Sequence, residues 1–144
     1  MKMTPTHEEG FSITGFSVRT QNKDEFNPNT ARIPKLWQQF HTSNLQAKSQ
    51  AGIFAVYTNY DSDANGFYNY TLGINSGENG EVKVEAGPYL IFQGKGPMPE
   101  TVIEAWKKIW SFFENSKEYE RNFISDYEVY STADEVKIYI GIKP

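Results

Sequence analysis

The stretch DYEVYS, residues 126–131, sets a carboxylate in the middle of a strand-like run of aromatic and β-branched residues. Tyr127, Val129 and Tyr130 favour strands, whereas glutamate is depleted in them. Aromatic ring faces attract cations, and a carboxylate supplies the countercharge. Glu128 is therefore the first candidate for a ligand-binding residue, and a solvated strand surface is the alternative interpretation of the same pattern.

The alternation of side chains along a strand predicts which residues share a face with Glu128. The closing segment EVKIYIGIK, 135–143, has an aliphatic face made of Val136, Ile138, Ile140 and Ile142. We expect that face to pack on the helices, because nothing else can cover it. Lys137 and Tyr139 point the other way, and we expect Glu128 and Tyr130 to join them on the helix-free side of the sheet.

The two halves of the chain repeat the same order of elements, which indicates a duplication. Each half, about residues 11–75 and 82–143, contains a strand, a helix and two further strands. The segment AVYT of the first half aligns with EVYS of the second, so Ala55 corresponds to Glu128. An alanine at the equivalent position indicates that the fold itself does not need an acid there.

The duplication predicts an α+β fold. Two β-α-β-β units would form one antiparallel sheet, with two helices on one face and a ligand groove on the other. We expect residues 1–10 to be a flexible lead-in and residues 11–144 to form a single domain. Tyr57, which the repeat aligns with Tyr130, is expected in the groove.

Two segments, 31–45 and 101–116, have the apolar periodicity of amphipathic helices. Pro34 fits the first of them only in the opening turn. In the second, Trp106 and Trp110 lie four residues apart on the apolar stripe. We expect both indoles in the core, with the edge of one ring reaching the groove as the alternative.

Composition excludes several classes of function. The chain has 144 residues, of which 15% are aromatic, with a formal net charge of −4 and no cysteine. Disulfides, thiol nucleophiles and cysteine metal sites are excluded, and the lone His7 and His41 lack metal-ligand spacing, so we expect no metal and no cofactor. A mildly acidic chain without a basic run is a poor nucleic-acid binder. No apolar run reaches the ~20 residues that span a bilayer. We expect a cytoplasmic protein.

Three segments in order, IEAWKKIW after a proline-containing turn, YEVY and the closing VKIYIGIKP, resemble the GyrI-like small-molecule-binding domain over about residues 11–143. This bacterial domain occurs alone and as the effector-binding half of AraC-type and MerR-type multidrug regulators. The resemblance implies two β-α-β-β modules of the SHS2 type and a groove between the two halves. It also implies a glutamate that meets cationic lipophilic drugs, which matches Glu128. Tyr130 and Tyr139 match two further groove positions.

The chain departs from the family pattern at Lys137, where many relatives have an acid. In a simple hairpin Lys137 would face Glu128 across the strands. Such a pair contributes roughly 0.2–1 kcal/mol. We expect it to neutralise the groove in part.

The resemblance leaves three functions open. The first is a stand-alone protein that binds a lipophilic, drug-like small molecule, either cationic or neutral, for sensing or sequestration. The second is a hydrolase of electrophilic cyclopropane-type compounds with Glu128 as general base. The third is a protein-interaction module, such as a gyrase inhibitor. We expect a small lipophilic ligand, a monomer or a dimer, and a separate transcription regulator or gyrase as the candidate protein partner.

Overall fold

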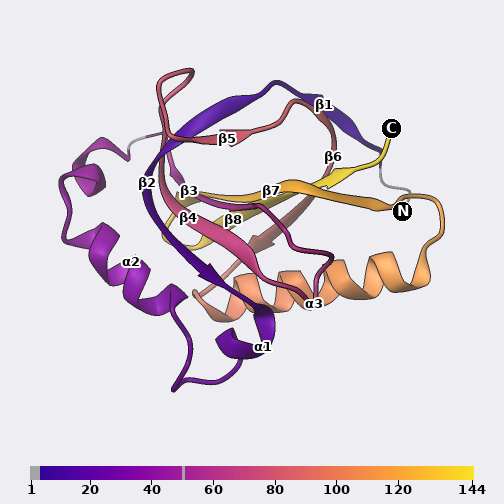
Figure 1. Cartoon of the computed structure of the whole chain (residues 1–144), viewed down its shortest axis with the longest axis horizontal. Coiled ribbons are helices and arrows are strands. Elements are labelled where there is room, and N and C mark those ends of the chain that lie inside the picture. The colour runs from indigo at the N-terminus through magenta and orange to yellow at the C-terminus, as the bar shows by residue number, and fades with distance from the viewer. Residues whose placement is uncertain (1–3, 50) are drawn as a thin grey trace.

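The computed structural model describes residues 4–49 and 51–144 (Figure 1). Its elements in chain order are β1 (Thr6–Glu8), β2 (Phe11–Thr20), α1 (Asn22–Glu25), α2 (Ile33–His41), the 3-10 turn η1 (Asn44–Lys48), β3 (Ile53–Thr58), β4 (Tyr68–Asn75), β5 (Val82–Val84), β6 (Gly87–Lys95), α3 (Glu100–Asn115), β7 (Arg121–Thr132) and β8 (Glu135–Ile142).

Within these described residues the strands form one eight-stranded sheet in the order β1-β6-β8-β7-β3-β4-β2-β5. All neighbouring strands are antiparallel. The order is symmetric about the central β3–β7 pair, since β4, β2 and β5 follow on one side as β8, β6 and β1 follow on the other. This is the order that two β-α-β-β units give in a shared sheet, so the predicted α+β fold is confirmed.

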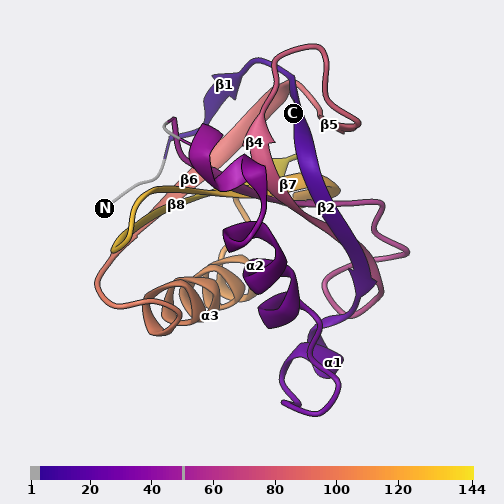
Figure 2. The same ribbon diagram turned by 90° about the vertical axis from the view of Figure 1, so that its left-hand side faces the viewer.

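The two long helices pack on the same face of the sheet (Figure 2). Leu36 and Phe40 of α2 pack against Leu72 of β4. Ala105 and Ile109 of α3 cover the aliphatic face of β8, as its alternation predicts. Each helix therefore covers strands of its own half of the sheet.

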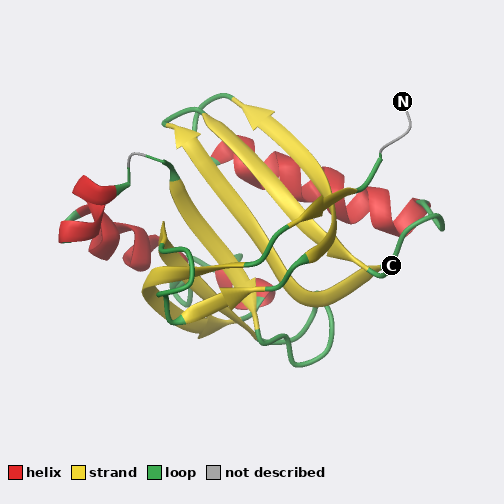
Figure 3. Ribbon diagram, turned by 90° about the horizontal axis from the view of Figure 1, so that it is seen from above, coloured by secondary structure: helices red, strands yellow, loops and turns green. Residues whose placement is uncertain are grey.

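The sheet is curled, and the face without helices encloses a core of its own. Ile13, Val56, Val84 and Tyr127 come from β2, β3, β5 and β7 and are buried together there. Figure 3, seen from above, shows the strands in front of the long helix α3. The helix-free face is therefore filled by packed side chains.

The structure differs from the expected elements at three places. Residues 6–8 lie in the expected lead-in but pair with β6 as the short strand β1, whose three residues give little sequence signal. Residues 22–25, which lie before the first expected helix, form the additional short helix α1. The expected helix 31–45 ends at His41, because the hydroxyls of Thr42 and Ser43 hydrogen-bond back to preceding carbonyls and offer the backbone an alternative to helix.

Candidate ligand-binding site

Glu128 lies on the helix-covered face of the sheet. It is paired with Ala55 of β3 and with Ile138 of β8, and paired residues of antiparallel strands project to the same side. The expectation that Glu128 occupies the helix-free face is therefore wrong. Sequence alternation orders the side chains within each strand, but the register between strands also depends on the turn, and a one-residue difference exchanges the two faces.

Tyr139 and Lys137 lie on the opposite face from Glu128, which corrects their expected place beside it. Tyr139 is paired with Tyr127, and their rings stack with centroids 4.4 Å apart and an interplanar angle of 8°. Lys137 is paired with Val129 and is exposed. Lys137 is thus separated from Glu128 by the sheet and does not neutralise its carboxylate.

Three aromatic side chains donate hydrogen bonds to the Glu128 carboxylate. The hydroxyl of Tyr130 donates to Oε1 at 2.6 Å, while the hydroxyl of Tyr57 and the indole Nε1 of Trp106 both donate to Oε2 at 2.7 Å. Glu128 is only 2% exposed. Among the described residues, no basic side chain forms an ion pair with it. The three donors hold the carboxylate in place, but no basic side chain of the described residues balances its charge.

Burial raises the pKa of Glu128 above its ordinary value of 4.5, and the hydrogen bonds from Tyr130, Trp106 and Tyr57 lower it in part. The two effects have different origins. Removal from water disfavours the ionised form, whereas each donor stabilises it. A cation beside Glu128 would act in the same direction as the donors. The ionised form of Glu128 is therefore stabilised only in part by the protein.

Glu128 borders a cavity of about 710 Å³ between the sheet and the two helices. Its walls are rich in aromatic side chains. The lining rings are those of Phe26, Trp37, His41, Tyr57, Tyr60, Tyr68, Tyr70, Trp106, Trp110 and Tyr130. The cavity lies within the size range of small-molecule sites, which are typically ~300–1,000 Å³ and mainly apolar with a few polar groups.

Tyr57 is the centre of the aromatic wall. Its ring lies 5.2 Å from the rings of Tyr68 and Tyr70 and 5.3 Å from that of Trp106. On the α2 side, the indole Nε1 of Trp37 donates to the Tyr70 hydroxyl at 3.0 Å. Burial raises the pKa of Tyr57, Tyr68 and Tyr70, so these phenols stay neutral at physiological pH. The wall is thus a rigid, uncharged set of ring faces.

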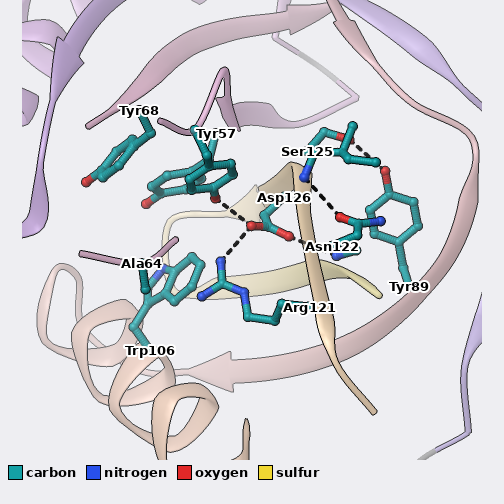
Figure 4. A network of polar contacts seen from close by, with 12 residues as sticks. Tyr57, Ala64, Tyr68, Tyr89, Trp106, Arg121, Asn122, Ser125 and Asp126 are labelled. Carbon is teal, nitrogen blue, oxygen red and sulfur yellow. Dashed lines mark hydrogen bonds and ion pairs between the residues drawn. The ribbon is translucent and has the colours of Figure 1, made fainter. Parts of the chain in front are cut away.

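A second polar cluster lies at the end of the cavity where β7 begins (Figure 4). Nη2 of Arg121, which lines the cavity, is 2.7 Å from Oδ2 of the fully buried Asp126. The hydroxyl of Tyr60 donates to the same carboxylate, and the backbone N–H of Gly141 donates to its other oxygen at 2.8 Å. The arginine is therefore neutralised by a carboxylate that is itself held from three directions.

Of the residues expected to bind a ligand, Glu128, Tyr130 and Tyr57 come together in this cavity. Both tryptophans of α3 also line it, so more than one ring edge reaches the ligand space. Tyr68 and Tyr70 were not among the expected residues, although Tyr70 is paired with Tyr57 and therefore shares its face. Trp37, Tyr60 and Arg121 were not among them either. The alternating tyrosines of FYNYT were the available signal for the first pair.

Residues 6–142 match the model of the Cass2 family, described as integron-associated effector binding protein. The chain belongs to this family. The resemblance to GyrI-like domains is confirmed, because the Cass2 family belongs to the GyrI-like superfamily.

Two relatives match over nearly their whole length. The protein YobU of Bacillus subtilis (strain 168), named as a candidate transcriptional regulator, is 32% identical over 96% of both chains. The integron cassette protein VCH_CASS2 of Vibrio cholerae is 32% identical, with a TM-score of 0.88 over 98% of this chain and 95% of the other.

A more distant structure shares the fold alone. SAV2435, solved with bound tetraphenylphosphonium, is 16% identical with a TM-score of 0.74, over 99% of this chain and 94% of that one. Within the part of the chain described here, no helix is long and apolar enough to cross a membrane.

Proposed function

We propose that the protein binds a lipophilic aromatic cation in the cavity between α2, α3 and the sheet, and that it acts in sensing or sequestration of that molecule. The observation that carries the proposal is the buried carboxylate of Glu128, which has three aromatic hydrogen-bond donors and no cationic partner among the described residues. An uncompensated buried charge is costly in a folded protein. A cationic ligand would remove that cost.

The walls of the cavity determine the kind of cation. Tyrosine and tryptophan faces attract positive charge, at about 0.5–2 kcal/mol for each contact. Most of the acceptor sites of the Glu128 carboxylate are already occupied by protein donors. A cation with a delocalised or shielded charge therefore suits the site better than a cation that needs several hydrogen-bond acceptors. Such a ligand is matched by ring faces and by the field of the carboxylate.

The relatives support this proposal in two respects. The family description names effector binding, which is small-molecule recognition in general terms. SAV2435, which shares the fold, was solved with tetraphenylphosphonium, an aromatic cation. The regulator name of YobU favours sensing over sequestration.

Two isosteric ions provide the test. Tetraphenylphosphonium and tetraphenylborate have the same shape and opposite charge. We expect the phosphonium to bind with measurable heat in calorimetry and the borate to show no binding, because Glu128 repels it. Equal binding of the two ions would show that the cavity selects shape alone, and would contradict the proposed role of Glu128.

A further inference from the structure

The cavity is lined by a second charged residue, Arg121, to which the proposed binding of a cation by Glu128 gives no role. Arg121 is only 9% exposed, and it lines the cavity at the start of β7. The centroid of the Phe123 ring lies 4.4 Å from its guanidinium carbon, and that of Trp106 lies 5.8 Å away. Two aromatic rings and the ion pair with Asp126 fix the plane of the guanidinium, so its donors have set directions (Figure 4).

One donor of this group is left over. Nε of Arg121 is buried and has no hydrogen-bond partner within residues 4–49 and 51–144. Leaving a buried donor unsatisfied is unfavourable, and the great majority of buried polar atoms have partners. Asp126 accepts from Nη2 of Arg121 and not from Nε, and its oxygens also accept from Tyr60 and Gly141. The guanidinium thus has more donors than the surrounding protein has acceptors.

We propose that Arg121 is a second recognition point, which takes a neutral hydrogen-bond acceptor, such as a carbonyl or ether oxygen, of the same ligand whose charge Glu128 balances. This inference rests on the proposed binding of an aromatic cation. An arginine can only donate, so its partner must be an acceptor.

A neutral acceptor fits better than an anion. Asp126 already balances the charge of Arg121, and Glu128 adds a further negative charge to the same cavity. A ligand carboxylate would be repelled by both acids, whereas a carbonyl oxygen meets only the N–H groups.

Trp106 links the two recognition points. Its Nε1 donates to Glu128, and its ring lies against the guanidinium of Arg121. The Glu128 carboxylate and the Arg121 guanidinium therefore contact the same indole, the first at its Nε1 atom and the second over its ring. The inferred ligand is an aromatic cation with an oxygen acceptor on a ring attached to the charged system.

Three dyes with one cationic xanthylium core test this inference in the wild-type protein. Tetramethylrosamine has a plain phenyl ring, tetramethylrhodamine methyl ester adds an ester to that ring, and tetramethylrhodamine replaces the ester by a carboxylate. We expect the ester to bind about tenfold more tightly than the rosamine, the size of one hydrogen bond to a charged donor. We expect the carboxylate dye to bind most weakly, although it is nearly the size of the ester.

The double variant Arg121→Met with Asp126→Asn removes the donor and its buried partner charge together. In it, the ester and the rosamine should bind within about twofold of each other, as expected once the hydrogen bond is lost. If the ester and the rosamine bind equally to wild type, Arg121 has no recognition role and the cation site stands. Tightest binding of the carboxylate dye would also overturn the inference, since it would make Arg121 an anion site. Failure of all three dyes to bind would overturn both proposals.

Discussion

Ala55 and Glu128 face each other across the central strand pair, and they occupy equivalent positions in the two halves of the chain. The local symmetry axis of the sheet therefore passes between them. Glu128 thus lies at the centre of the helix-covered face, and only one half contributes an acid there. Tyr57 and Tyr130, which also correspond, both donate to this one carboxylate. The site combines a nearly symmetric aromatic frame with an acid on only one side of this axis.

The equivalence with Ala55 leads to a prediction about stability. The Glu128→Gln variant should be as stable as wild type below pH 4.5 and at least as stable at pH 7. The raised pKa of Glu128 means that the native state keeps a proton at pH values where the unfolded chain has lost it. The contribution of Glu128 to the free energy of unfolding therefore falls as pH rises above 4.5, and the glutamine variant has no such loss.

Urea unfolding at several pH values measures this difference, and Glu78→Gln, in an exposed turn, is the matched control. A glutamine variant that loses stability specifically at neutral pH would show that the ionised carboxylate is favoured by the fold.

Tyr130 and Tyr139 form a matched pair for the ligand site. Tyr130→Ala should weaken binding of an aromatic cation by a few-fold to about thirtyfold, the range of one cation–π contact. Tyr139→Ala should leave that affinity unchanged, because the ring lies on the other face and stacks on Tyr127. It should instead lower the free energy of unfolding. Fluorescence titration with one dye compares the two variants, and an affinity loss confined to Tyr139→Ala would place the ligand on the helix-free face.

Removing one donor from Glu128 should shift the pH dependence of binding. Tyr130→Phe deletes the hydroxyl that donates to Oε1, and this raises the pKa of Glu128 further. Cation affinity increases as the carboxylate ionises, so the midpoint of its pH profile should move upward. Tyr139→Phe should leave the midpoint in place. Calorimetric titrations from acid to neutral pH measure it, and a downward movement in Tyr130→Phe would contradict the hydrogen-bond assignment.

Lys137→Gln should not change cation affinity by more than about twofold, which is the size of a screened long-range charge effect. Its side chain is on the face opposite Glu128, paired with Val129. A clear gain in affinity would mean that the ammonium group does reach the Glu128 carboxylate in solution.

The fold could be predicted further than the site, for physical reasons. The alternation of residues in β8 and the repeated order of elements were enough to predict the antiparallel sheet and the packing of Ile138 on a helix. They were not enough for the face of Glu128, because that depends on the register of β7 against β8, which is irregular between Tyr130 and Thr132. Arg121 was not predictable either, since it reaches the cavity only through its ion pair and the bulge in β7.

The Glu128→Gln variant isolates the negative charge of the site, because it keeps the size of the side chain and removes its charge. Binding of tetraphenylphosphonium should be measured by calorimetry at pH 7.5 for wild type and variant, with folding checked by thermal unfolding. We expect the variant to bind at least tenfold more weakly, a loss of about 1.4 kcal/mol or more. Equal affinity of a folded variant and wild type would show that Glu128 is not the countercharge of the ligand.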